Sequence, residues 1–316
     1  MKRRSFLKGS AVAGVTTLCG AGCRTSGSHA MKSGMPELTA PEKPAQLNLC
    51  LQWGKIPGGD MNQKLDFLEE NGFKAVEIPS GRWPIENCDA MIEAMKGRKL
   101  FIATACGPSN FSYAEAEKRE AEVQKFLPVV EALGKMNSVG LIICPARSKP
   151  GMGHKELRHD FVTNTGKRLA EHAHKHGTSI VLEPLRRNET PFLRQVADGA
   201  TMARDTGPGC TVMGDFWHMG LEETSFMGAF ISGGDLLTHV HIAGLKKRII
   251  PGIYPEDDDY VDGFKGLKLI GYRGAVSFEG GWPKNPADPK KGLPEKERIR
   301  LMRNMVKMLE TQWEMA

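Results

Sequence analysis

Four polar residues, each closing a short apolar run, have the types and spacing of a metal site. An unpaired charge would be costly to bury at the end of such a run. Brought to one centre, they would form an oxygen-rich ligand set with a single imidazole. That set suits Mn²⁺, Mg²⁺ or Co²⁺ better than a thiolate zinc site. The four residues are Glu183, Asp215, His241 and Glu279, and the pattern predicts one divalent metal ion as cofactor.

The elements that must position these residues are predicted to be eight strands, each followed by a helix. The β-rich runs are 47–53, 74–79, 100–106, 139–145, 179–184, 211–216, 239–243 and 275–279. Repeated right-handed βα units give a parallel sheet buried on both faces. Eight units in about 270 residues match an α/β fold of the closed (β/α)₈ TIM barrel type, whose functional residues lie at the C-terminal strand ends. An open doubly wound sheet would favour a G-x-G-x-x-G fingerprint, and Pro57-Gly58-Gly59 after the first strand is not one.

Amphipathic helices are predicted between the strands, at 60–70, 115–133, 157–176, 193–205 and 295–315. His172, His174 and His176 lie near the end of the third of these. Residues four apart share a helix face, so His172 and His176 could chelate a metal. We interpret the run instead as histidines favoured by the negative end of a helix dipole, because no carboxylate marks a site beside them in the sequence.

Charge is unevenly distributed along the chain. The formal net charge is +6, from 43 Lys and Arg against 37 Asp and Glu. Residues 1–35 contain six basic residues and no acidic one, so residues 36–316 are balanced at 37 of each sign. Nucleic-acid and anionic-membrane partners require an excess of Lys and Arg near phosphates. The charge-balanced body therefore favours no nucleic-acid partner.

The N-terminal segment is predicted to direct export. Lys2-Arg3-Arg4-Ser5-Phe6-Leu7-Lys8 precedes a weakly apolar run at 9–21 that is too short to span a bilayer. It resembles a twin-arginine signal, which implies export of a folded protein to the periplasm or another extracytoplasmic space. Membrane attachment is expected only if Cys23 is lipidated. We predict a signal and the start of a tether at 1–35, a linker at 36–45, and a single barrel domain at 46–316.

Four motifs carry a resemblance to a known family over about residues 46–316. They are 182–189 (LEPLRRNE), 215–218 (DFWH), 239–243 (HVHIA) and Phe278-Glu279. The chain resembles the xylose-isomerase-like TIM-barrel sugar phosphate isomerase/epimerase family, in particular ketose 3-epimerases and hydroxypyruvate isomerases. The resemblance implies that Glu183, Asp215, His241 and Glu279 bind one divalent metal.

The same resemblance implies further roles at the site. Glu183 and Glu279 would also be the catalytic acid/base pair, and Glu189 and His218 would contact the sugar. A substrate-binding arginine follows the metal histidine by six residues in that family. Here this position is Lys247, and Arg248 comes one residue later.

Such a site suits removal of a proton next to a ketone. A divalent ion held against the carbonyl oxygen stabilises the resulting cis-enediolate as a Lewis acid, and a carboxylate within hydrogen-bond reach takes the proton. Two carboxylates on opposite faces allow removal from one face and return to the other, which is epimerisation. Return to the adjacent carbon is isomerisation, and the ligand set does not distinguish the two.

Several other residues are predicted to lie near the site. Trp217 and Trp282 flank ligand residues and could stack on a sugar. His239 lies two residues before His241 and is predicted to be an interior, hydrogen-bonded histidine supporting the site. Glu77 is predicted either near the pocket mouth or in a helix-facing salt bridge. The long loop at 251–263 is a candidate lid or homo-oligomer contact.

The leading interpretation is a metal-dependent sugar isomerase or epimerase with a small-molecule sugar substrate. A 3-keto-glycoside lyase or hydrolase on the same barrel is the first rival, since proton removal next to the ketone could expel the glycosidic group. Hydroxypyruvate isomerase is another. A metal-dependent endonuclease would need more His and Asp ligands on early strands and a basic groove. A non-catalytic sugar-binding protein would not need two carboxylates around a metal.

Overall fold

The computed structural model describes residues 43–107, 109–147 and 149–316. The predicted export signal at 1–35 and most of the predicted linker at 36–45 lie outside the described residues. None of the described helices is both long enough and apolar enough to cross a membrane.

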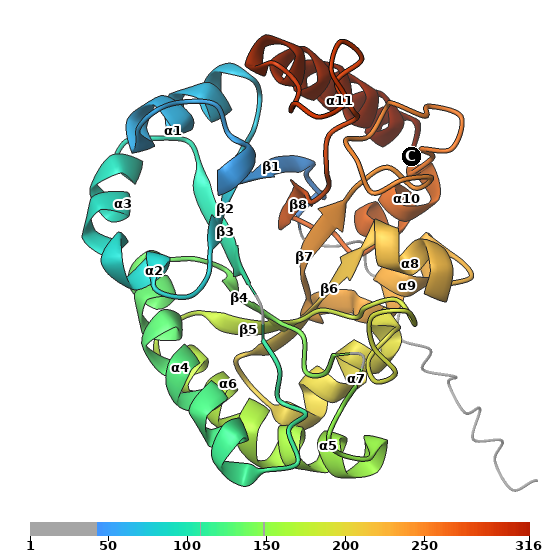
Figure 1. Cartoon of the computed structure of the whole chain (residues 1–316). Coiled ribbons are helices and arrows are strands. Elements are labelled where there is room, and N and C mark those ends of the chain that lie inside the picture. Colours follow the sequence, from blue (N-terminus) through green and yellow to red (C-terminus); the bar gives the residue numbers. More distant parts are fainter. Residues whose placement is uncertain (1–42, 108, 148) are drawn as a thin grey trace, which may run out of the picture. The chain divides into compact units, whose positions relative to one another are not determined.

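Eight parallel strands close into a barrel in chain order, as the sequence predicts (Figure 1). The barrel closes where β1 pairs with β8, with Asn48 opposite Ala275 and Leu51 opposite Phe278. The fold is therefore the predicted (β/α)₈ TIM barrel. The strands are β1 Asn48–Gln52, β2 Ala75–Pro79, β3 Phe101–Cys106, β4 Gly140–Ile143, β5 Ser179–Leu182, β6 Cys210–Asp215, β7 Leu237–Ile242 and β8 Ala275–Phe278.

Helices form an outer ring around the strands (Figure 1). Short 3₁₀ turns at Trp53–Lys55 and Gly234–Leu236 add to them. The helices are α1 Met61–Glu70, α2 Trp83–Glu86, α3 Cys88–Met95, α4 Ala116–Lys135, α5 His154–Asp160, α6 Gly166–Lys175, α7 Val196–Thr206, α8 Phe216–Glu222, α9 Phe226–Gly233, α10 Val261–Leu269 and α11 Glu295–Met315.

Two predicted segments differ from the structure. The helix predicted at 157–176 is divided into α5, a π-helical turn at Phe161–Thr165, and α6. The ring of the buried Phe161 lies against Gly166, where an added Cβ would come 2.1 Å from the Phe161 Cε1 atom. This packing explains why residue 166 is a glycine, since any side chain there would clash with the ring. The loop predicted at 251–263 also ends earlier, because α10 begins at Val261.

The barrel interior changes from apolar to polar along its axis. Small residues fill one part of it, namely Cys50, Ala75, Ala103 and Ala275, and Ile142, Val181 and Met213 form a second group. Residues two apart on a strand face the same side. Glu183 follows Val181 by two residues, and Asp215 follows Met213 by two, so both carboxylates point inward at the C-terminal strand ends.

An aromatic cluster fixes the segment after β6. The ring of Phe216 makes edge contacts with Phe226, Phe230 and Tyr260 at centroid distances of 5.0, 5.3 and 5.0 Å. Edge-to-face aromatic pairs add stability beyond the area that they bury. Because Phe216 directly follows Asp215, this cluster also holds the end of β6 in place.

We predict that Phe230→Ala lowers the free energy of unfolding by about 3–5 kcal/mol, because it leaves a cavity beside Phe216. Phe230 is completely buried. The matched control is Ile231→Ala on the same helix, at a residue 45% exposed, which should change stability by about 0.5 kcal/mol or less. Urea denaturation measures both, and equal effects would contradict the packing described.

Candidate metal centre and active site

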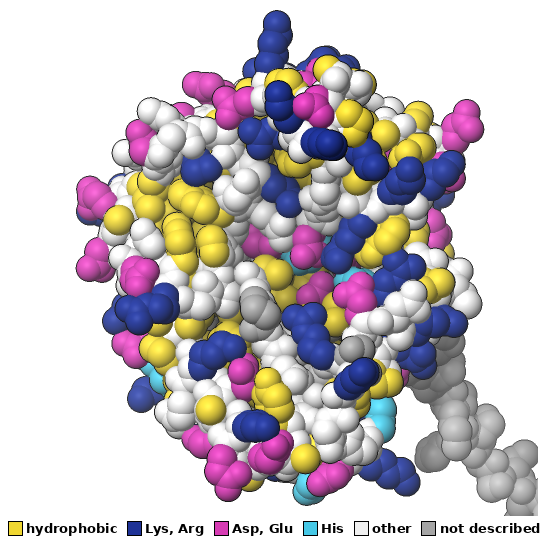
Figure 2. Space-filling model, viewed as in Figure 1, with side chains coloured by type: hydrophobic (Ala, Val, Ile, Leu, Met, Phe, Trp, Pro, Cys, Tyr) yellow, Lys and Arg dark blue, Asp and Glu magenta, His cyan; other side chains and the backbone are white. Residues whose placement is uncertain are grey.

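The C-terminal ends of β5, β6, β7 and β8 bring four ligand atoms within 4.8 Å of one another, from Glu183, Asp215, His241 and Glu279. Asp215 and His241 are fully buried, and Glu183 is 5% exposed. The Glu279 side chain is 23% exposed. Figure 2 shows acidic and histidine side chains gathered in a hollow in the middle of this face. The cluster is therefore buried on the barrel side and open toward the hollow.

His241 fixes the chemistry of the cluster through its two ring nitrogens. Its Nε2 lies 2.8 Å from Glu77 Oε2, so the Nε2–H is donated there. Its Nδ1 lies 2.9 Å from Glu279 Oε2 yet makes no aligned hydrogen bond within the described residues. If the imidazole were neutral, its unprotonated Nδ1 and Glu279 Oε2 would be two hydrogen-bond acceptors facing each other. Such a contact requires a proton or a cation between the two atoms. The residues present therefore fit a metal ion.

The ionisation of the cluster is set by opposing effects. Burial raises the pKa of Asp215. Burial also acts to raise the pKa of Glu279, but His241 and Arg248 outweigh it and hold that pKa at about 2. For His241, burial acts to lower the pKa, and the charges of Glu77 and Glu279 raise it well above the usual value. Glu279 is thus an ionised carboxylate that attracts a cation.

Arg248 reaches the cluster from the segment after β7. Its Nη2 lies 2.6 Å from Asp215 Oδ2 and also pairs with Glu279 Oε2. The three carboxylates of the cluster and the Arg248 guanidinium have a summed formal charge of −2. One divalent ion would balance that charge.

Lys247 does not join this cluster. It is exposed, and its Nζ lies 5.4 Å from the centre of the Tyr254 ring. A tight turn after β7 explains the difference between the two neighbours. Gly244 N–H donates to the Ile249 carbonyl at 2.8 Å, and the turn directs Arg248 inward and Lys247 outward. The basic group at the centre therefore lies one residue beyond the position that the family pattern gives.

His218 and Glu189 lie beside the four ligands. The buried His218 ring, on α8, has its Nε2 3.4 Å from Asp215 Oδ2 and 3.8 Å from Glu183 Oε1. Its Nδ1 faces Glu189 at 3.7 Å and accepts the Arg186 N–H at 3.3 Å. The Glu189 side chain is 38% exposed, so it lies where a ligand in the hollow could reach it.

The two tryptophans have different surroundings. Trp217 donates its backbone N–H to Asp215 Oδ1 at 2.8 Å, and the Arg186 guanidinium lies 4.5 Å over its ring. Trp282 packs edge-on against Phe278 at 5.7 Å. Trp217 thus orients a ligand carboxylate through its backbone, and both rings already have protein partners.

Glu77 lies in the barrel interior directly beneath the mouth cluster, so the alternative of a helix-facing salt bridge was wrong. It is 1% exposed inside the barrel, where its Oε2 meets His239 Nε2 at 2.9 Å and His241 Nε2 at 2.8 Å. Gln52 donates to its other oxygen at 2.7 Å. Burial acts to raise the pKa of Glu77, but the two histidines outweigh burial and hold it well below its usual range. As predicted, His239 is an interior hydrogen-bonded histidine.

Glu77, His239 and His241 also form a group that could hold a metal. Their ligand atoms are already hydrogen-bonded to one another and completely shielded from solvent. The four-residue group reaches the hollow through Glu279, whereas this trio does not. The trio is therefore better suited to orienting His241, as carboxylates do for metal-ligating histidines.

Cys144 is a further residue of the site that the sequence did not predict. Its thiol donates to Glu183 Oε2 at 3.2 Å, and burial raises its pKa well above the usual value. A thiol kept protonated in this way can hold one Glu183 oxygen while the other faces the cluster. A single cysteine at a strand end gave no signal in the sequence.

The loop after β5, which carries Glu189, is tied to α8 by Glu222. The Glu222 side chain is only 4% exposed and accepts the Arg187 backbone N–H at 2.7 Å and its Nε–H at 2.8 Å. Burial acts to raise the pKa of Glu222, but its hydrogen bonds with Arg187 outweigh that effect and lower it.

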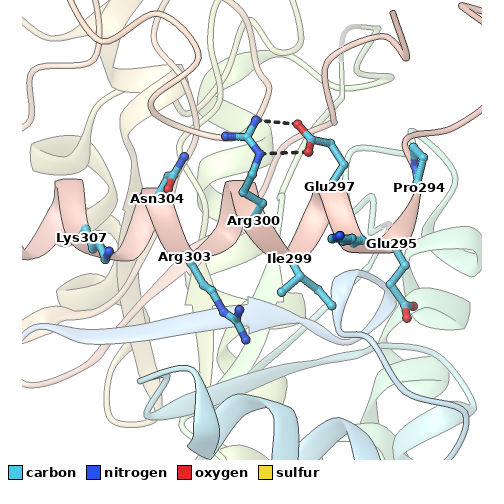
Figure 3. Close-up of a pocket in the computed structure, with 9 residues that line it drawn as sticks. Pro294, Glu295, Glu297, Ile299, Arg300, Arg303, Asn304 and Lys307 are labelled. Atoms are coloured by element: carbon cyan, nitrogen blue, oxygen red, sulfur yellow. Dashed lines mark hydrogen bonds and ion pairs between the residues drawn. The ribbon is translucent and has the colours of Figure 1, made fainter. Parts of the chain in front are cut away.

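A separate surface hollow runs along α11, away from the strand ends. Its lining includes Glu297, Arg300 and Arg303, and Figure 3 shows Arg300 paired with Glu297 along the helix. Arg300 pairs with its helix neighbour Glu297, and Arg303 donates to Asn71 Oδ1 at 2.8 Å. This hollow therefore lacks the convergent buried polar groups of the barrel mouth.

The family of the chain follows from a comparison with protein-family models. The model described as "Xylose isomerase-like TIM barrel" matches residues 65–305. The chain belongs to this family. The match spans β2 to β8 and includes all four ligand residues of the mouth.

Two relatives that sequence comparison finds are sugar epimerases. The chain is 28% identical to the 3-dehydro-D-guloside 4-epimerase of Escherichia coli K12 over 229 residues, which are 69% of this chain and 86% of that protein. It is 30% identical to the L-ribulose 3-epimerase of Methylomonas sp. DH-1 over 181 residues, 57% of this chain and 62% of that protein.

Solved structures share the fold of the barrel. The E. coli 3-keto-D-glucoside 4-epimerase superposes with a TM-score of 0.72 at 24% identity, covering 84% of this chain and all of that one. The D-psicose 3-epimerase of Clostridium cellulolyticum H10, solved with D-tagatose, gives 0.73 at 19% identity, over 84% of this chain and 99% of that one.

We predict that Glu222→Gln destabilises the protein at neutral pH by about 1–3 kcal/mol, because a charged hydrogen-bond acceptor is lost. The folded-state pKa of Glu222 lies below the unfolded value of about 4.3. Its contribution is therefore complete above that value and lost as the pH falls through the folded pKa. The stability difference between wild type and variant should shrink below about pH 4.3, as measured by urea denaturation across pH.

The neighbouring Glu223→Gln is the matched control. Burial raises the pKa of Glu223, so wild type should gain stability relative to this variant as the pH falls. Parallel pH profiles for the two variants would contradict the assigned environments.

Proposed function

We propose that this chain is a metal-dependent sugar epimerase that moves the proton on a carbon next to a ketone. One observation carries the proposal, namely two carboxylates, Glu183 and Glu279, that flank a cation-fitting cluster open to a hollow. Relatives that act as sugar epimerases support it.

The metal would be held by Glu183, Asp215, His241 and Glu279. When bound, a divalent ion supplies Lewis-acid stabilisation of the negative charge that develops on the substrate carbonyl oxygen. Mn²⁺, Mg²⁺ and Co²⁺ suit this oxygen-rich donor set. His241 would use Nδ1, since Glu77 holds Nε2.

Glu183 and Glu279 would transfer the proton. They end β5 and β8, with the ends of β6 and β7 between them, so they approach the hollow from different sides. For both, the nearby His241 outweighs burial and lowers the pKa, which favours the ionised form. One takes the proton, and the C–H electron pair enters the enediolate. The other, once it has taken a proton from solvent, returns it to the opposite face, which restores the ketone with inverted configuration and no redox change. The first then loses its proton to solvent, so both carboxylates are ionised again.

The groups around the pair would bind the sugar. Glu189, His218 and Arg248 border the hollow with acceptors and donors suited to hydroxyl groups. Arg248 would also keep Asp215 and Glu279 ionised while the product leaves and the next substrate binds.

A keto-glycoside is the substrate class that we favour. A 3-dehydro sugar epimerised at carbon 4 reacts next to its carbonyl, and the relative with that name matches over 86% of its length. The net charge of zero on residues 36–316 suits an uncharged sugar. The leader at 1–35, with its Arg3-Arg4 pair, supports an extracytoplasmic place for this reaction.

We predict that Glu183→Gln and Glu279→Gln each lower solvent-deuterium incorporation into a 3-keto-glycoside by about 10²–10⁴-fold, because each removes one proton-transfer group. NMR in deuterated water measures the incorporation next to the carbonyl. Free ketoses, tested in parallel, separate the keto-glycoside assignment from ketose 3-epimerisation, and release of the glycosidic group would indicate a lyase instead.

Asp215→Asn is the matched control, because Asp215 is a ligand outside the proton-transfer pair. Excess Mn²⁺ should restore exchange in this variant more than in the two glutamate variants, with metal content measured on each sample. Exchange indifferent to Glu183 and Glu279, or equal rescue of all three variants, would overturn the assigned roles.

We predict that Glu77→Gln weakens Mn²⁺ binding by about 10–100-fold, because a neutral amide orients His241 less firmly than a carboxylate does. Equilibrium dialysis with Mn²⁺ measures the dissociation constant without reference to turnover. Glu93→Gln, at a carboxylate 72% exposed on α3, should leave the constant unchanged. Unaltered Mn²⁺ affinity in Glu77→Gln would remove its positioning role.

A further inference from the structure

Three metal-ligating side chains gather between α4 and α6, away from the barrel mouth. His172 and His176 lie one turn apart at the end of α6, and Glu131 faces them from α4. Because α6 leads into the start of β5 and the mouth lies at the ends of the strands, this cluster is at the opposite end of the barrel. The carboxylate partner that the sequence did not reveal is thus supplied by another helix.

The distances between the ligand atoms of the cluster are close to those between ligands of one metal ion. One ligand atom from each residue lies within 4.8 Å of the other two. Two ligands of one Zn²⁺ at about 2.1 Å each lie at most about 4.2 Å apart. The His172 and His176 rings have centroids 4.5 Å apart, tilted by 51°. Small side-chain rotations would therefore bring the three atoms to ligating distance.

One ligand atom lacks any other partner. His172 Nε2 is shielded from solvent and makes no hydrogen bond with the described residues. Burial and the neighbouring His176 lower the pKa of His172, so its imidazole is neutral at neutral pH. A buried nitrogen lone pair without a donor is costly, and a bound cation would remove that cost.

The two helices are held rigidly at this point. An added Cβ at Gly134 of α4 would lie 2.3 Å from the His176 carbonyl oxygen, so the backbones are in close contact. Lys135 is the group that competes with a metal, since its Nζ lies 2.9 Å from Glu131 Oε1. The Lys135 side chain is 60% exposed and can leave for solvent.

We propose that Glu131, His172 and His176 form a Zn²⁺ site that joins α4 to α6, with water completing the coordination. Two imidazoles and one carboxylate form a ligand set found at zinc sites. The mouth offers one imidazole and three carboxylates instead, so the two centres differ in the metals that they prefer. The proposal does not depend on the sugar chemistry.

Zn²⁺ titration of the full chain, first saturated with Mn²⁺, tests this site by calorimetry and by thermal unfolding. Wild type should bind Zn²⁺ and gain thermal stability as it does so. His172→Ala should weaken this binding by about tenfold or more, because it removes a direct ligand. His174→Ala, at an exposed histidine of the same helix, is the matched control and should bind as wild type does.

Lys135→Ala should change the affinity in the opposite direction. Removing the competing ammonium frees Glu131, so Zn²⁺ should bind more tightly, which a damaged fold could not produce. Equal Zn²⁺ binding by wild type, His172→Ala and Lys135→Ala would overturn the proposal. Zn²⁺ uptake that only displaces Mn²⁺ would also do so, since it would place the ion at the mouth.

Discussion

The barrel mouth depends on how one imidazole is held between two carboxylates. His241 meets Glu77 with Nε2 at 2.8 Å and Glu279 with Nδ1 at 2.9 Å. The first contact takes up the Nε2–H, and the second places Nδ1 against a carboxylate oxygen, so a proton or a cation must lie between these two atoms. Because all of this is buried, the arrangement persists only with a compensating positive charge. Arg248 supplies part of that charge, and we propose that a divalent cation supplies the remainder.

The closed barrel is what allows carboxylates distant in sequence to share this centre. Strand residues alternate between the interior and the helices, so a polar residue two positions after an interior apolar one points into the mouth. Glu183 follows Val181 in this way, and Asp215 follows Met213. The ends of β5 and β8 lie on either side of β6 and β7. Glu183 and Glu279 can therefore face the hollow from different sides.

The sequence was sufficient to predict features set by neighbouring residues. It did not predict contacts between residues far apart in the chain. Eight apolar runs with polar ends sufficed for the barrel and for a set of four residues that the structure brings together. Glu77 could not be assigned because its partner His241 lies 164 residues later, and nothing near Glu77 indicates that neighbour. The choice between Lys247 and Arg248 depended on a turn that residue types alone do not determine. The helical pattern at 157–176 likewise gave no sign of the π-helical turn at Phe161–Thr165.

The two ends of the barrel use the same pair of residue types for different purposes. At the mouth, histidine and glutamate are largely buried, so each charge strongly affects the ionisation of the others. Between α4 and α6, His172, His176 and Glu131 are only partly enclosed, and an ion bound there would join two helices. TIM barrels separate catalysis at the C-terminal face from stability at the other face. A cation at the second centre would therefore stabilise the scaffold without acting on the carboxylates at the mouth.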